Sequence, residues 1–576
     1  MSAAPAADAP TPRLALRALA CRFADPPAQA LAGVSLVAGA GELVAIMGAS
    51  GAGKSTLLRC VNGLVPSLAP AATSGAILLD GNDILGAPTG ALAGRIAMVF
   101  QDFEAQLFST NVRLEVAFGP TQLGMPPAEI ARRVDAALAQ VELRDETHRD
   151  PRELSGGQKQ RLAIASILAM APGVVLLDEA ATDLDPIGRQ ELYATLQRLR
   201  VQDIALIAVE HEIEPLVEAD RLYLMREGTI VASGPAETLA RDVDAFRACG
   251  VRPHDLAVLG RRLGIALPLR VPDAVAELRR RFPVLAGAAP RDAAPAPSAR
   301  VTPAREVAPI LEIEHLTYRY REGTAAVDDA SLAIRPGELI ALVGQNGSGK
   351  TTLAKHLNGL LRATHGRIRL EGADVAQLPL DRVAQRVGYV FQNPDDQLFA
   401  ATVAEEVAFG PRNFGFEDDA LAARVRETLE AVGLVERGAD DPFLLSKGER
   451  QRLAVATVLA MAPRVLILDE PTTGLDHPQQ RRMLELLVRL RAGGTAIVLI
   501  THTPWVVAEY AERVLVMRDG RLVFDGDFAR FVADPALTSA AAFDPPPATR
   551  VGLAFGHAVR SVDELVAALG LPESPA

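Results

Sequence analysis

The sequence predicts an α/β fold that occurs twice along one chain. Near-continuous apolar runs, such as 174–177 and 497–500, alternate with amphipathic helical patterns, as is typical of parallel strands buried on both faces. Chemically similar residues also recur at one fixed spacing in the two halves: Gln101 and Gln392, Ser155 and Ser446, Asp178 and Asp469, His211 and His502. A chain of 576 residues is too long for a single core. We therefore predict two α/β domains, each with a core of its own.

The two domains are predicted to span residues 11–245 and 309–545. Between them, residues 285–308 are rich in Ala and Pro and have no sustained apolar period, which predicts a semi-extended linker. Within residues 246–284 and 546–576, the stretches 251–282 and 548–570 resemble each other weakly, and each ends in a helix-like pattern. We interpret them as small segments appended to the two domains.

The halves differ in length at one place. The first half carries five extra residues in the stretch 66–74, where the second half has only 362–365. Because the longer stretch is rich in Pro and Ala, we predict a lengthened loop there.

Each half contains a Gly-rich loop directly after an apolar strand pattern. Both loops, Gly48–Ser55 and Gly344–Thr351, have the form G-x-x-x-x-G-K-[ST]. Such glycines let backbone N–H groups turn towards phosphate oxygens, the lysine reaches the terminal phosphates, and the hydroxyl binds Mg²⁺. The chain has only five lysines, and two of them occupy this motif position. We predict ATP binding by Gly48, Ser50, Gly51, Gly53, Lys54, Ser55 and Thr56, and by Gly344, Asn346, Gly347, Gly349, Lys350, Thr351 and Thr352.

A pair of carboxylates ends a later apolar strand in each half. The pairs are Asp178-Glu179 and Asp469-Glu470, and the carboxyl ends of parallel strands form the edge at which ligands bind. We predict that each aspartate belongs to the Mg²⁺ shell and that each glutamate polarises the attacking water.

Upstream of each carboxylate pair lies a short motif that carries a family resemblance. Leu154-Ser155-Gly156-Gly157-Gln158 and Leu445-Ser446-Lys447-Gly448-Glu449 resemble the signature motif of ATP-binding cassette (ABC) ATPases, and the Gly-rich loops and Asp-Glu strands resemble their Walker A and Walker B motifs. The resemblance covers nearly all of both halves. It implies that each domain is a P-loop NTPase with a mostly parallel core sheet, an antiparallel β subdomain and a helical signature subdomain.

The resemblance also implies roles for further residues. Asp183-Leu184-Asp185 and Gly474-Leu475-Asp476 would lie in D-loops, and His211 and His502 would be catalytic beside Glu179 and Glu470. Phe23 and Tyr320 would stack on adenine, although Phe23 also fits a core residue at a strand edge. Gln101 and Gln392 of the Q-loops would contact the nucleotide and would also join the metal shell, with Ser55, Thr351, Asp178 and Asp469. The remaining implied nucleotide contacts are the signature residues Ser155, Gly156, Gly157, Gln158, Ser446, Gly448 and Glu449.

In this family two cassettes face each other head to tail, so that each ATP lies between the Walker motifs of one cassette and the signature of the other. The fused chain would form such a pair within itself. Lys447 and Glu449 depart from the usual glycine and glutamine of the signature. We predict two active sites, which need not be equal.

The residues after each Q-loop glutamine indicate which group of ABC ATPases the chain resembles. Phe100–Phe108 with Val116–Pro120, and Phe391–Phe399 with Val407–Pro411, resemble ATPase subunits of energy-coupling factor (ECF) importers for vitamins, vitamin precursors or cobalt and nickel ions. The fused form resembles particularly the one associated with thiamine-precursor uptake. The implied partners are an integral-membrane coupling subunit and a membrane-embedded substrate-binding subunit, with this chain peripheral at the cytoplasmic face. Candidate docking residues, which could instead only pack the helical subdomain, are Phe103, Glu104, Gln106, Asp395, Asp396 and Gln397.

Composition limits the alternatives. A net charge of −12 argues against an electrostatic grip on nucleic acid, and no apolar run approaches the ~20 residues that cross a bilayer. The three cysteines lack ligand spacing and are interpreted as reduced thiols. Two alternatives remain: a soluble double-cassette ATPase of translation or DNA repair, and the ATPase of a conventional ABC transporter.

Overall fold

The computed structural model describes residues 12–571 except 25–26, 182–183, 286–306, 321–322 and 324. The chain forms two compact units, Met1–Arg261 and Arg262–Ala576. Their boundary falls within helix α10 (Asp255–Leu263), whereas the predicted linker lies almost wholly outside the described residues. Each unit is described by itself.

The core of unit 1 is a six-stranded sheet in the order β10-β9-β3-β8-β7-β6. All neighbouring strands are parallel except β9 and β10. Every residue of β3, β7 and β8 is buried, which explains why their sequences are apolar without alternation. The strands are β3 (Leu43–Gly48), β6 (Ile96–Val99), β7 (Val174–Asp178), β8 (Ala205–Val209), β9 (Arg221–Arg226) and β10 (Thr229–Pro235).

A second, antiparallel sheet of unit 1 has the order β2-β1-β4-β5. It corrects the prediction for the five extra residues. Strand β4 begins at Ala71, and residues 71–74 pair with the end of β1, so much of the predicted loop is strand. The strands are β1 (Leu14–Ala24), β2 (Pro27–Ala38), β4 (Ala71–Leu79) and β5 (Asn82–Asp83).

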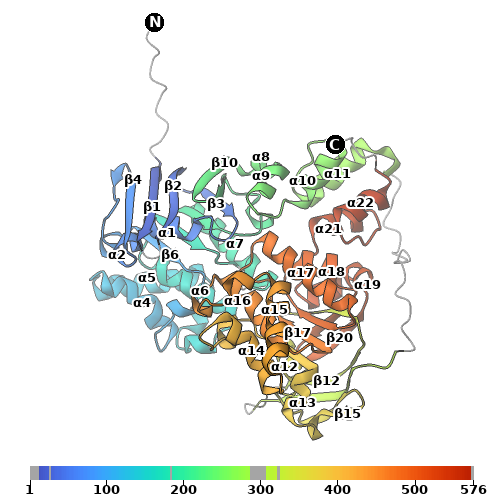
Figure 1. Cartoon of the computed structure of the whole chain (residues 1–576). Helices are drawn as coiled ribbons and strands as arrows, with labels where there is room; N and C mark the ends of the chain where they lie inside the picture. The colour runs from blue at the N-terminus through green and yellow to red at the C-terminus, as the bar shows by residue number, and fades with distance from the viewer. Residues whose placement is uncertain are drawn as a thin grey trace. The chain divides into compact units, whose positions relative to one another are not determined.

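Helices complete unit 1. Helix α1 begins directly at the end of the first Gly-rich loop, and α4, α5 and α6 pack against one another as a helical subdomain (Figure 1). The α-helices of this unit are α1 (Lys54–Val61), α2 (Leu64–Ser67), α3 (Thr89–Leu92), α4 (Val112–Gln122), α5 (Pro127–Gln140), α6 (Gly156–Leu168), α7 (Pro186–Arg200), α8 (Ala236–Leu239) and α9 (Val243–Ala248).

Unit 2 repeats this architecture. Its core sheet has the order β16-β17-β18-β13-β19-β20 and its antiparallel sheet the order β12-β11-β14-β15. Again, all core strands are parallel except the last pair. The strands are β11 (Leu311–Arg319), β12 (Ala325–Ile334), β13 (Leu339–Val343), β14 (His365–Leu370), β15 (Ala373–Asp374), β16 (Val387–Val390), β17 (Val465–Asp469), β18 (Ala496–Ile500), β19 (Arg513–Arg518) and β20 (Arg521–Gly526).

The helices of unit 2 include one that precedes its cassette. Helix α11 packs on α21, and Arg279 of α11 donates to the Ala554 carbonyl at 3.1 Å. The two segments that the sequence marks as appended therefore contact each other within unit 2. The α-helices are α11 (Val271–Arg281), α12 (Lys350–Leu357), α13 (Leu380–Arg386), α14 (Val403–Asn413), α15 (Asp418–Val432), α16 (Lys447–Leu459), α17 (His477–Ala492), α18 (Pro504–Tyr510), α19 (Phe528–Ala533), α20 (Pro535–Ala540), α21 (Pro547–Ala554) and α22 (Val562–Leu569).

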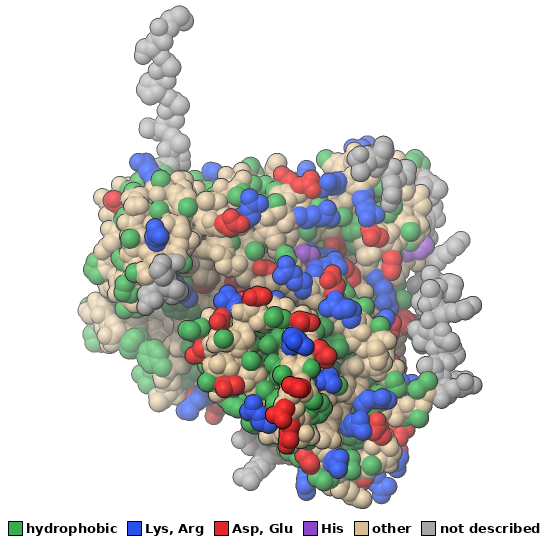
Figure 2. Space-filling model, viewed as in Figure 1, with side chains coloured by type: hydrophobic (Ala, Val, Ile, Leu, Met, Phe, Trp, Pro, Cys, Tyr) green, Lys and Arg blue, Asp and Glu red, His purple; other side chains and the backbone are tan. Residues whose placement is uncertain are grey.

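The predicted fold class is confirmed: each unit has a mostly parallel core sheet, an antiparallel sheet and a helical subdomain. Among the described residues, no helix combines the length and apolar character needed to span a bilayer. Charged side chains of both signs are interspersed over the face shown in Figure 2.

Candidate functional site

Each Gly-rich loop joins a buried central strand to a helix and holds its lysine inward. Lys54 donates to the carbonyls of Gly48 at 2.8 Å and Ala49 at 3.0 Å. Lys350 makes the same bonds to Gly344 and Gln345, at 2.8 and 2.9 Å. Lys54 is 4% exposed and Lys350 is 7% exposed, so each ammonium group lies at the inner side of its loop. The other loop residues predicted to contact nucleotide are Ser50, Gly51, Thr56, Asn346, Gly347 and Thr352, which lie in or directly after the same turns.

The last glycine of each loop cannot be replaced without rebuilding the turn. Gly53 and Gly349 have φ values of 97° and 101°, in the left-handed region that favours glycine. A Cβ on Gly53 would lie 2.5 Å from the carbonyl oxygen of Ala30, and one on Gly349 would clash with that of Ala326. The predicted role of these glycines in shaping the loops thus has a steric basis.

The loop hydroxyl and the strand-end aspartate meet in both units. Ser55 donates to Asp178 at 2.9 Å, and Thr351 donates to Asp469 at 2.8 Å. Both aspartates are 3% exposed. Mg²⁺ in nucleotide sites is held by one or two carboxylates, hydroxyls, waters and phosphate oxygens, so this donor set fits it. Burial raises the pKa of Asp178, and the negative charge of Glu179 adds to this effect against the Ser55 hydrogen bond.

The glutamates that follow these aspartates have unusual backbone conformations. Glu179 and Glu470 have φ values of 53° and 51°, which non-glycine residues seldom adopt. Each is held in place through its amide N–H, which donates to Val209 at 2.9 Å or to Ile500 at 3.0 Å in the next strand. Such strain is common where a fold presents a side chain for chemistry.

In unit 1 the predicted catalytic side chains form a connected group. Glu179 accepts a hydrogen bond from Gln101 at 2.8 Å, and its other oxygen lies 2.7 Å from Nε2 of His211. The residues come from three elements: the segment after β6, the end of β7 and the end of β8. Their position at one sheet edge agrees with the sequence prediction.

In unit 2 the corresponding group is looser. Nε2 of His502 lies 3.6 Å from Glu470, and Thr473 donates to the other carboxylate oxygen at 3.4 Å. Within the described part of the chain, Gln392 and Glu470 are not hydrogen-bonded to each other. Burial, with the neighbouring charge of Asp469, raises the pKa of Glu470 well above its usual range.

The two signature motifs begin helices α6 and α16 with the same capping box. Ser155 and Gln158 bond reciprocally through side chain and backbone, as do Ser446 and Glu449. In unit 2 the Ser446 hydroxyl also donates to the Glu449 carboxylate at 2.7 Å. Burial opposes ionisation of Glu449, but its hydrogen bonds from Ser446 and the nearby Arg437 outweigh this effect and lower its pKa. The predicted signature glycines Gly156, Gly157 and Gly448 lie in the first turns of these helices.

The remaining predicted residues differ in how well they are placed. Tyr320 is 48% exposed, with its hydroxyl 3.3 Å from Thr352, so its ring is available beside the second loop. Phe23 packs against the core of unit 1, as its alternative interpretation expects. Asp185 and Asp476 of the D-loops cap helices α7 and α17, and Asp183 lies outside the described residues.

The candidate docking residues are mostly occupied internally. Phe103 is 5% exposed. Gln106 and Gln397 each accept from the backbone N–H of the phenylalanine at the start of their segment, at 3.0 Å. Glu104 and Asp395 form ion pairs with Lys159 at 3.0 Å and Arg450 at 2.8 Å. Gln397 also donates to Ala454 of α16, in the helical subdomain, whereas Gln106 donates to Met98 of β6; Asp396 is exposed.

One surface feature that was not predicted from the sequence recurs in both units. Phe108 and Phe118 form an edge-to-face pair with ring centroids 4.7 Å apart, and Phe399 and Phe409 form the same pair at the same distance. Their exposures are 63% and 44% in unit 1 and 61% and 47% in unit 2. Both pairs lie within the quoted segments, so the recurrence of two phenylalanines could have identified them.

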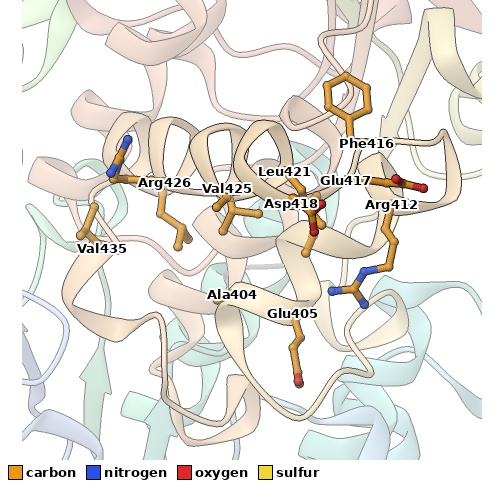
Figure 3. A pocket seen from close by; sticks show the side chains of 13 residues that line it. Ala404, Glu405, Arg412, Phe416, Glu417, Asp418, Leu421, Val425, Arg426 and Val435 are labelled. Carbon is orange, nitrogen blue, oxygen red and sulfur yellow. The ribbon is translucent and has the colours of Figure 1, made fainter.

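The helical subdomain of unit 2 also has a groove of about 780 Å³ between α14 and α15. Figure 3 shows Arg412, Glu417 and Asp418 at one end and Arg426 and Val435 at the other. Apolar side chains of both helices line the stretch between them. Since α14 also carries Phe409, the groove and the exposed pair belong to one helical subdomain.

Comparisons with known proteins agree with this architecture. A family model described as "ABC transporter" matches residues 31–182 and 327–473. A putative ABC transporter ATP-binding protein of Caldanaerobacter subterraneus is 42% identical over 93% of this chain and 95% of its own length. Another from Methanosarcina acetivorans is 40% identical over 94% of this chain and 90% of its own.

Among solved structures, cbiO1 from Clostridium perfringens, described as part of the ABC transporter complex cbiONQ, is 35% identical. The match covers 40% of this chain and 93% of that one, with a TM-score of 0.37. The family model, which matches in both halves, and the relatives of similar length establish that this chain belongs to the ABC transporter family as an ATP-binding protein with two cassettes.

Proposed function

We propose that this chain is the ATP-hydrolysing subunit of an ECF-type importer that takes up a vitamin, a vitamin precursor or a transition-metal ion. It would work at the cytoplasmic face of the membrane, with an integral-membrane coupling subunit and a membrane-embedded substrate-binding subunit. The two cassettes would form an intramolecular head-to-tail pair with two composite Mg·ATP sites.

One observation carries the proposed coupling. Gln101, which donates to Glu179, lies only seven positions before the exposed Phe108. The short segment between them is fastened by Gln106, whose side chain bonds to the backbone of β6 and the residue after it. A partner that moves the surface pair would therefore move the glutamine at the reacting group. The same spacing separates Gln392 from Phe399 in the second half of the chain.

The chemistry assigned to each unit follows from its side chains. Lys54 and Lys350 would bind the terminal phosphates, and Glu179 and Glu470 would accept a proton from the attacking water. His211 and His502 would orient the attacking water and the glutamate relative to each other. Mg²⁺, when bound, supplies charge neutralisation on the phosphates, and Ser55, Asp178, Thr351 and Asp469 would hold it together with Gln101 and Gln392.

We assign the groove between α14 and α15 to a helical segment of the coupling subunit. Its apolar floor suits the apolar face of a helix, and the charged residues at its ends suit a polar rim. The groove shares helix α14 with Phe409, so one partner segment could contact both.

The test is purification of the tagged chain from detergent-solubilised membranes, followed by identification of what accompanies it. We expect an integral-membrane subunit in the purified complex, and its loss when Phe108→Glu and Phe399→Glu are combined. Val201→Glu and Leu68→Glu are matched controls, because both residues are exposed and apolar but lie elsewhere. ATP binding by all variants should be unchanged. Recovery with ribosomes and no membrane subunit would contradict the proposal.

A further inference from the structure

The second strand-end aspartate has a hydrogen-bond donor that the first lacks. Oδ2 of Asp469 accepts from Thr351 at 2.8 Å and also from the hydroxyl of Tyr389 at 2.9 Å. Tyr389 lies on β16, the neighbour of β17, whose last residue is Asp469. Tyr389 is 8% exposed and Asp469 3%, so this hydrogen bond is shielded from water.

The tyrosine ring is fixed as well as buried. It packs edge to face against Phe391, with ring centroids 5.0 Å apart. A phenol whose ring cannot turn presents its hydroxyl in one direction, and a carboxylate that accepts from it loses rotational freedom.

Unit 1 carries a different side chain at the matching position. Met98 on β6 takes the place of Tyr389, and its sulfur accepts from Asn62 at 3.0 Å rather than contacting the aspartate. Met98 is 6% exposed, so the position is buried in both units. The side-chain hydrogen bond to Asp178 comes from Ser55. The two aspartates therefore differ by one buried hydroxyl.

We propose that Tyr389 is a positioning residue that fixes the Asp469 carboxylate and makes the second cassette the tighter of the two for the metal of Mg·ATP. The inference rests on the proposed assignment of Asp469 to the metal shell. Side chains that hydrogen-bond to a metal-binding carboxylate orient it, and removing them typically costs about 10- to 100-fold in metal affinity or activity.

The experiment measures metal binding instead of turnover. In the full chain, Lys54→Ala silences the first loop and Glu470→Gln prevents hydrolysis, so that Mn²⁺ bound with ATP can be followed at the second site by electron paramagnetic resonance. We expect Tyr389→Phe to raise the Mn²⁺ concentration for half-saturation roughly tenfold. Tyr389→Met, which introduces the residue of unit 1, should give a similar shift. ATP binding without metal should remain unchanged.

Tyr510→Phe is the matched control, because Tyr510 also has a hydroxyl in a side-chain hydrogen bond, to Arg481 at 3.0 Å, but lies on α18. It should leave the Mn²⁺ titration unaltered. A Tyr389→Phe protein with wild-type Mn²⁺ affinity would overturn the positioning role. So would an equal loss of metal-free ATP binding, since that would show a damaged strand. If the parent protein with Tyr389 intact binds no Mn²⁺·ATP, it is the proposed nucleotide site that fails.

Discussion

The two cassettes share every predicted hydrolytic residue but surround them differently. In unit 1, Glu179 is in contact with Gln101 and His211, whereas in unit 2 the distance from Glu470 to His502 is 3.6 Å. Unit 2 has instead a second donor to its aspartate, Tyr389. The comparison shows that identical motifs do not imply identical sites, because the side chains that contact the motif residues differ between the two units.

A second difference lies in the residues around His211 and His502. Glu210, Glu212 and Glu214 flank or follow His211, whereas the matching positions of unit 2 are Thr501, Thr503 and Trp505. Glu210 is 6% exposed, and its carboxylate accepts from the Ala181 amide at 3.3 Å. Burial, partly opposed by Arg189, raises the pKa of Glu210 to about 8, and burial raises that of Glu214 to about 7.

The largest expected effect breaks both sites at once. Glu179→Gln and Glu470→Gln should each lower ATP turnover, and the double variant should lose roughly 10²- to 10⁴-fold, because a positioned general base contributes that much. Phosphate release measured at saturating Mg·ATP checks this. The two single variants should differ from each other if the unlike surroundings matter. A double variant with wild-type turnover would remove both glutamates from the mechanism.

The acidic cluster of unit 1 should make its stability depend on pH. A carboxyl whose pKa is raised in the folded state keeps its proton there while the unfolded chain loses it. The free energy of unfolding should therefore fall as pH rises from about 4.5 to 8, by up to ~1.4 kcal/mol per pH unit for one such group. Glu210→Gln should remove the part of this slope that Glu210 contributes and leave the part due to Glu214.

Hydrogen exchange can measure this dependence in the two units separately. Exchange of β8 next to the cluster, corrected for the intrinsic effect of pH, should accelerate with pH in the wild type and much less in Glu210→Gln. Strand β18 of unit 2 is no control, because its last residue, Ile500, is hydrogen-bonded to the amide of Glu470, whose pKa is also raised. The control is therefore β8 itself in Glu210→Gln, and equal pH dependence of β8 in the two proteins would contradict the prediction.

The second signature offers a smaller effect. Glu449 carries a negative charge at the start of a helix that, by the proposed pairing, would meet the phosphates bound by the first loop. Repulsion between unit charges 4 Å apart is about 1 kcal/mol even in bulk water, so Glu449→Gln should tighten ATP binding at that site roughly fivefold. ATP titration of the Lys350→Ala background, in which only the first loop binds, measures it. Gln158→Glu in the opposite background should weaken binding by a similar factor.

The smallest effect concerns a position where the cassettes do match. Ser55 and Thr351 donate to their aspartates at 2.9 and 2.8 Å. Exchanging them, as Ser55→Thr with Thr351→Ser, should therefore change turnover by no more than about twofold, or ~0.4 kcal/mol. A much larger change would locate part of the asymmetry at the loop hydroxyls themselves.

The sequence was sufficient for the fold and for the residues of the loops, because those depend on local patterns. Buried parallel strands read as unbroken apolar runs, and the glycines of the loops are imposed by positive φ and close backbone contacts. Repetition in the two halves made each motif a check on the other.

What the sequence could not supply depends on contacts between elements. No spacing rule places Tyr389 beside Asp469, since the two are joined by the pairing of β16 with β17. Burial of Phe103 and exposure of Phe108 likewise depend on how the segment turns between β6 and α4. The predicted loop at 66–74 was partly wrong because its Ala-rich end finds a partner strand in β1.

The left-handed backbone conformations of Glu179 and Glu470 lower the stability of the fold while they hold the carboxylates proposed for activity. Left-handed conformations cost an ordinary residue roughly 1–2 kcal/mol, a strain that glycine would relieve. A substitution to glycine at either position would therefore stabilise the fold but remove the carboxylate. By the proposed mechanism, each unit thus bears this backbone strain in order to keep a carboxylate at the position where water is activated.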